Sequence, residues 1–128
     1  MNTMKLEIVT PLGLVYDADV AQVTLPGKEG EFGVLPQHAS LVSLLDAGVI
    51  TIETANKKEI NVAINSGYVK VDENKVMCIV DGAVTLNDED GQLSARLDEA
   101  KELLQKAETS STAIATAVGK VESISKVR

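Results

Sequence analysis

The spacing of apolar residues changes once along this chain, near residue 87, from every second residue to every third or fourth. Before that point Met4, Leu6 and Ile8 alternate with polar neighbours, and a similar alternation recurs at residues 49–52, 60–64 and 69–71. A period of two predicts half-buried strands. Because turn residues separate these strands and no helical pattern intervenes, residues 1–87 are expected to form an antiparallel β-sandwich or a flattened barrel.

After residue 87 the pattern becomes helical. One apolar stripe contains Leu93, Leu97, Ala100, Leu104 and Ala107. These residues are spaced by four, three, four and three, which places them on one side of a helix. A polar break at 109–112 offers an N-cap for a second helix, with the stripe Ile114, Ala117, Val118, Val121 and Ile124. Two short helices with so short a break form an antiparallel hairpin, so residues 88–128 are expected to be a separate helical unit.

Charge and composition exclude several classes of protein. A net charge of −7 would repel phosphate backbones and anionic lipid, and the few aromatic residues (Tyr16, Phe32 and Tyr68) provide no stacking platform, so no nucleic-acid binding is expected. His38 and Cys78 are the sole residues of their types, which rules out a disulfide framework or a zinc site. Cys78 lies in the apolar run 76–80 and is expected to be a buried, inert thiol. The sequence contains no run of about 18 apolar residues, so no membrane insertion is expected.

Neither the single histidine nor the glycine-containing segment matches a catalytic pattern. His38 is the sole candidate base for a nucleophile, and its spacing to Ser40 matches no nucleophile elbow. The glycines of residues 27–33 are interrupted by Glu29 and Glu31, which would oppose a bound phosphate. We therefore expect that the protein is not an enzyme, has no catalytic residue, and binds no metal or cofactor.

The stretch from Pro26 to His38 has the most unusual composition in the chain, with three glycines and two prolines that specify tight turns. Two interpretations stay open. Either the stretch forms one edge of the sandwich with Phe32 and Val34 in the core, or it is a rigid loop that presents Glu31, Phe32 and His38 to a partner.

Three segments resemble the epsilon-subunit family of the bacterial rotary ATP synthase. They read Gly-Glu-Phe-Gly-Val-Leu-Pro-Gln-His-Ala at 30–39, Ser-Gly-Tyr-Val-Lys-Val at 66–71 and Lys-Leu-Glu-Ile-Val-Thr-Pro at 5–11. The resemblance implies a sandwich of about ten strands with a C-terminal two-helix hairpin. It also implies a non-catalytic role, in which the subunit binds the gamma subunit and the polar loops of the c-ring and couples proton transport to ATP synthesis. The ring-facing loop would contain Glu29, Gly30, Glu31, Phe32, Gly33 and His38.

In the same family the helical hairpin can extend toward the catalytic head and block ATP hydrolysis. Here the resemblance implies contact of the catalytic beta subunit with a mildly basic end, formed by Lys120, Lys126 and Arg128. Some members bind ATP through a Leu/Ile-Asp-x-x-Arg-Ala motif. Arg96 matches its arginine, but Leu93 replaces the acid and the flanking alanine is missing, so ATP binding is not expected.

Two alternatives to a coupling subunit remain at this point: an ATP-sensing regulatory subunit, and a free-standing interaction adaptor built on a sandwich. The N-terminus, Met1–Lys5, has neither the apolar stretch of a secretory signal nor the Arg/Ser bias of a transit peptide. With the resemblance, this favours a peripheral position at the cytoplasmic face of a bacterial inner membrane.

Overall fold

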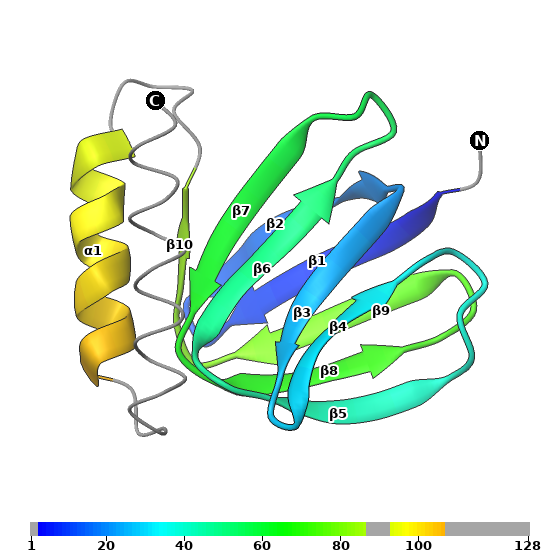
Figure 1. Cartoon of the computed structure of the whole chain (residues 1–128), viewed down its shortest axis with the longest axis horizontal. Coiled ribbons are helices and arrows are strands. Elements are labelled where there is room, and N and C mark those ends of the chain that lie inside the picture. The colour runs from blue at the N-terminus through cyan, green and yellow to red at the C-terminus, as the bar shows by residue number, and fades with distance from the viewer. Residues whose placement is uncertain (1–2, 87–92, 107–128) are drawn as a thin grey trace.

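The structure is a computed structural model that describes residues 3–86 and 93–106, and within the helix the side chains of residues 97–104. Strands fill the first of these ranges and a helix the second (Figure 1). They are β1 (Met4–Thr10), β2 (Gly13–Val20), β3 (Gln22–Gly27), β4 (Gly30–Val34), β5 (Leu41–Leu45), β6 (Gly48–Glu53), β7 (Glu59–Ile64), β8 (Gly67–Val71), β9 (Lys75–Val80), β10 (Ala83–Thr85) and α1 (Leu93–Lys106).

One continuous sheet contains all ten of these strands, in the order β10-β7-β6-β3-β5-β8-β9-β1-β2, with β4 paired to β3 outside that order. A single paired position, Gly27 with Leu45, joins β3 to β5, and there the sheet turns from one layer into the other. Figure 1 shows the resulting sandwich, with β10, β7, β6 and β3 in one layer and β5, β8, β9, β1 and β2 in the other. This confirms the predicted sandwich of about ten strands.

The expectation of a purely antiparallel sheet is wrong for one pair of neighbouring strands. Strand β1 pairs with β9 in parallel, with Leu6 opposite Val76 and Ile8 opposite Cys78. Parallel neighbours require a long crossover connection, and here the strands from β2 to β8 provide it. Alternation within one strand reports which residues face the core but not the direction of its neighbour, so the sequence pattern does not reveal this pair.

The period-two pattern predicts the main core well. Met4, Leu6 and Ile8 are buried between the layers, as are the alternating residues of β7, β8 and β9. Ala63 departs from the pattern: it lies on the outer side of β7 but is fully buried, because α1 covers that side. Continuous burial from Gly48 to Ile50 has the same cause, since Val49 contacts the helix-covered cluster.

Helix α1 packs on the outer side of the layer formed by β6, β7 and β10. The buried residues Leu97, Ala100 and Leu104 confirm the helical stripe within the described side chains. They form a small second core with Ala47, Val49, Ala63 and Leu86. The second helix, and with it the hairpin, would lie in residues outside those that the structure describes. The domain boundary at residue 87 also lies there and stays a prediction.

Cys78 is buried in the main core, as the apolar run around it predicts. Burial raises the pKa of its thiol to about 12, because the thiolate would lose its hydration in this environment. The nucleophilic form is therefore nearly absent at neutral pH, which agrees with a structural and inert thiol.

Candidate interaction surfaces

The hairpin between β3 and β4 forms a sharply defined tip at Lys28, Glu29 and Gly30, all exposed. Gly30 has φ +134°, a conformation that side chains other than glycine rarely adopt. At Gly27 a Cβ would lie 2.6 Å from the carbonyl oxygen of Gly30 and 2.8 Å from the ring of Phe32. The two glycines therefore allow the tight turn and the close packing of Phe32 against it.

Phe32 and Val34 lie in or against the core, as the first interpretation of this segment predicts, and presentation of its exposed residues to a partner stays a prediction. Val34 is fully buried and Phe32 packs half-buried against the main core, so both side chains point inward. Glu31 and Gly33 alternate with them and are exposed. Of the ring-facing residues implied by the resemblance, Glu29, Gly30, Glu31 and Gly33 thus lie on the surface of one hairpin, while Phe32 supports it from inside.

His38 is separated from that tip by the length of β4. The backbone N–H of Gln37 donates to the carbonyl oxygen of Glu73 at 2.7 Å, which attaches the segment after β4 to the turn between β8 and β9. The partly exposed His38 ring contacts its own chain, with Nδ1 2.6 Å from the carbonyl oxygen of Ala39. The structure therefore does not bring His38 together with Glu29 and Glu31.

A row of apolar side chains crosses the outer side of the layer opposite α1. Strand register places Leu44 beside Tyr68, Tyr68 beside Ile79, Ile79 beside Val9, and Val9 beside Leu14. We call these five residues the apolar row. Leu44 is 58% exposed and Leu14 55%, whereas apolar side chains that line up across several strands are normally buried. Val42 and Leu12, also exposed, enlarge the apolar area beyond the row.

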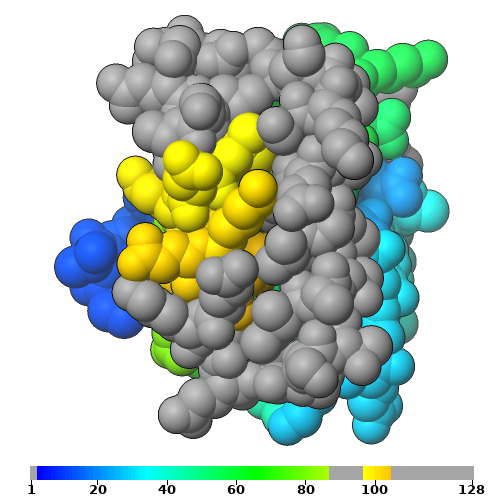
Figure 2. Space-filling model, turned by 60° about the vertical axis from the view of Figure 1, so that its left-hand side comes forward, coloured from blue at the N-terminus to red at the C-terminus, as the bar shows by residue number. Residues whose placement is uncertain are grey.

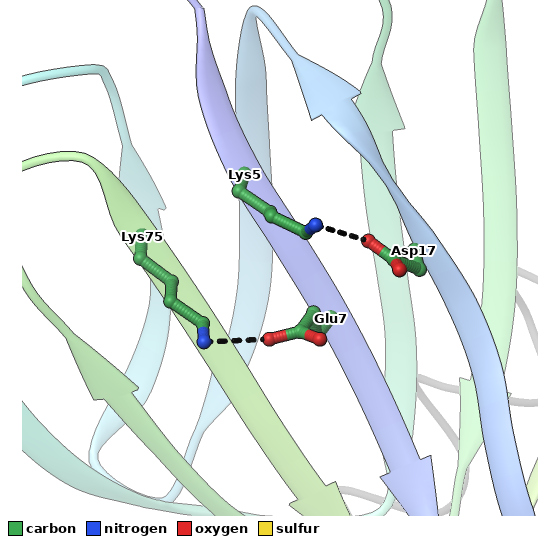
Figure 3. A network of polar contacts seen from close by, with 4 residues as sticks. All are labelled: Lys5, Glu7, Asp17 and Lys75. Atoms are coloured by element: carbon green, nitrogen blue, oxygen red, sulfur yellow. Dashed lines mark ion pairs between the residues drawn. The ribbon is translucent and has the colours of Figure 1, made fainter.

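Two ion pairs lie elsewhere on this outer side (Figure 3). Lys75 Nζ lies 2.8 Å from Glu7 Oε1, and Lys5 Nζ lies 3.2 Å from Asp17 Oδ1, across the neighbouring strands β9, β1 and β2. The Asp17 carboxylate, through a hydrogen bond and its charge, raises the pKa of Lys5. Because these pairs are partly solvated, they contribute more to the pattern of charge on the surface than to stability.

The hairpin tip and the apolar row lie at the same end of the sandwich. The backbone N–H of Lys28 donates to the carbonyl oxygen of Leu44 at 3.0 Å, which joins the tip to one end of the row. The paired charges lie further from this end, toward the turn between β8 and β9. Tip and row are therefore adjacent at one end of the molecule.

On the α1 side of the molecule, the exposed part of the sheet is lined by polar and charged side chains. Figure 2 shows part of α1 in yellow on this side, with atoms from the N-terminal part of the chain in blue beside it. An open cleft of about 350 Å³ is lined by Gln22, Thr24, Thr51, Glu53, Lys57 and Glu59. Small-molecule sites are usually enclosed and largely apolar, so this open polar cleft does not indicate one. Within the described part of the chain, no three His, Cys, Asp or Glu side chains form a group suited to a metal ion.

Several expected contact residues lie beyond what the structure describes. Three of them, Lys120, Lys126 and Arg128, are outside the described residues. Arg96 lies in α1, where the structure describes its backbone but not its side chain. Contact of the basic end with the catalytic beta subunit therefore stays a prediction. In residues 3–86 and 93–106, no helix has the length and apolar character needed to cross a bilayer.

The fold defines this chain as a β-sandwich domain with an exposed apolar row beside a hairpin tip. Residues 3–86 match the family model described as "ATP synthase, Delta/Epsilon chain, beta-sandwich domain". The ATP synthase epsilon chain of Sulfurovum sp. is 69% identical over 126 residues, covering 98% of both chains. That of Campylobacter curvus is 49% identical over 129 residues and covers both chains fully.

Two solved structures share the fold. A chain from the cryo-EM structure of Euglena gracilis mitochondrial ATP synthase (OSCP/F1/c-ring) matches with a TM-score of 0.66 and 22% identity, covering 98% of this chain and 81% of that one. A chain from the Tetrahymena thermophila central stalk and c-ring matches with a TM-score of 0.56 and 13% identity, covering 98% and 96%. The chain belongs to the ATP synthase epsilon-chain family, which consists of non-catalytic stalk subunits.

Proposed function

We propose that this subunit is a rigid coupling element between the gamma subunit and the c-ring. In this arrangement the apolar row docks on gamma, and the β3–β4 tip at residues 28–31 rests on the polar loops of the ring. The observation that supports the proposal is the exposed apolar row beside that tip. Exposed apolar surface of this kind marks protein interfaces, and membership of the ATP synthase epsilon-chain family favours a subunit of the rotary complex over a free-standing adaptor.

The architecture suits the transmission of torque. A single sheet runs through both layers, so a force applied at the hairpin tip passes along hydrogen-bonded strands and not across a flexible linker. The tip itself is fixed by the packing of Phe32 on Gly27 and by its backbone bond to Leu44. Bound in this way, the subunit would turn with the ring, peripherally and at the cytoplasmic face of the inner membrane, while ATP is synthesised elsewhere in the complex.

The ring contact is tested with a cysteine in place of Glu31, in membranes whose c-subunit has a cysteine in its polar loop. Under mild oxidation Glu31→Cys is expected to form a disulfide with the ring, because Glu31 lies on the exposed side of the hairpin. The disulfide is measured as a shifted band on a non-reducing gel that disappears with reductant. Native Cys78 does not compete, since it is buried in the core.

A second cysteine variant is the control. Glu73 is also an exposed glutamate, but it lies in the turn that holds Gln37, at the opposite end of the sandwich. Glu73→Cys should form no disulfide with the ring. If Glu73→Cys reacts with the ring and Glu31→Cys does not, the proposed orientation is reversed and the proposal fails.

A further inference from the structure

One lysine on the outer side of the β5-β8-β9-β1-β2 layer differs from the other two. Lys5 and Lys75 are each paired with a carboxylate, Asp17 and Glu7. Lys70, in β8, is exposed and makes no side-chain ion pair or hydrogen bond within the part of the chain that the structure describes. Of these three lysines, Lys70 is therefore the one without a carboxylate partner among the described residues.

The neighbours of Lys70 explain why that charge matters. Register places Lys70 between Val42 on β5 and Met77 on β9, and Tyr68 of the apolar row precedes it by two residues on the same side of the strand. A partner that covers the apolar row would therefore also cover the Lys70 ammonium group or its immediate surroundings. An ammonium group that loses water without gaining an acceptor is strongly unfavourable.

We propose that Lys70 is a specificity-determining residue of the docking face, and that the partner surface is apolar with a carboxylate opposite Lys70. The inference depends on the proposed function, because it assumes that the apolar row docks on the stalk. Apolar contact alone discriminates poorly between partners, whereas a single desolvated charge favours a surface with the matching group and rejects others. The paired Lys5 and Lys75 would add little to this selection.

The test measures the affinity of the full-length chain for the purified rotary ATPase from which its own epsilon subunit has been removed. Lys70→Glu is compared with Lys57→Glu, an exposed lysine of the β6–β7 turn on the other layer. Both substitutions change the net charge from −7 to −9, so long-range repulsion is the same in both. Lys70→Gln removes the charge, and Lys70→Arg keeps it.

Lys70→Glu is expected to weaken binding by about 100-fold and Lys70→Gln by about tenfold, because the partner carboxylate loses its counter-ion. Lys70→Arg and Lys57→Glu should stay within about threefold of the parent chain. Equal weakening by both glutamate variants would show a long-range effect only, and unchanged binding of Lys70→Glu would show that no carboxylate faces it. Either result overturns the inference while docking itself stands, whereas a parent chain that does not bind at all contradicts the proposed function.

Discussion

Replacing Leu44 with Asp is expected to abolish stable assembly of the subunit with the stalk while leaving its fold intact. Leu44 is 58% exposed in the isolated chain, so a charged side chain there remains hydrated and costs little before docking. In the complex the same position would be at the end of a covered apolar row. A carboxylate there would be buried without a partner, and affinity should fall by at least about 100-fold, or about 2.7 kcal/mol. Titration of the purified variant onto the epsilon-depleted complex measures the loss.

Leu35 offers a closely matched control for this experiment. It is also a leucine and is 57% exposed, but it lies in the segment after β4, at the end of the sandwich away from the hairpin tip. Leu35→Asp should bind like the parent chain, because no apolar row surrounds that position. If Leu35→Asp is the variant that loses binding, the partner covers the opposite end, and the assignment of the docking face is wrong.

Among substitutions of glycine by alanine in the sandwich, Gly67→Ala should cause the largest loss of stability. Gly67 begins β8, and a Cβ there would overlap the carbonyl oxygen of Ile79 and lie 2.7 Å from the Cα of Val80. Backbone atoms of a paired strand cannot move aside as a side-chain end can. The free energy of unfolding, measured by urea titration, is expected to fall by about 3 kcal/mol or more. Because Ile79 belongs to the apolar row, docking should weaken as well.

The same change at Gly33 is the control for this result. A Cβ on Gly33 has as its nearest atom the side-chain nitrogen of Gln22 at 3.7 Å, which is an ordinary contact. Gly33→Ala should therefore change the unfolding free energy by no more than about 0.5 kcal/mol. Equal stability of the two alanine variants would mean that β8 and β9 can separate at Gly67, contrary to the close packing described above.

Much of the fold could be predicted from the alternation of single residues. Met4, Leu6 and Ile8 behave as the pattern predicts because one side of β1 faces a core and the other faces solvent. Ala63 could not be placed in this way, since the burial of its side depends on a helix that is distant in sequence. The parallel pairing of β1 with β9 was missed for a related reason: the choice of neighbour is a property of the whole sheet.

The apolar row, the proposed docking surface, could not be found from the sequence. Ile79 lies within the run 76–80 and Leu44 within 41–45, and both runs resemble buried strands in sequence. Only the register shows that their side chains line up with Tyr68 on the outer side of the sheet. The hairpin tip was easier to find, because glycines and prolines mark a turn locally. The family resemblance and the composition of the Pro26–His38 stretch grouped His38 with that tip, although β4 carries the chain away from Gly30 to the other end.

Hydroxyl-radical footprinting of the assembled complex tests the central claim most directly, because oxidation reports the solvent exposure of individual side chains. In the free chain Leu35, Leu44, Tyr68 and Ile79 are all exposed and should all be oxidised. On assembly, Leu44, Tyr68 and Ile79 are expected to lose most of their oxidation, while Leu35 keeps its reactivity and serves as the internal reference. An apolar row that is oxidised equally in the free chain and in the complex would contradict the account.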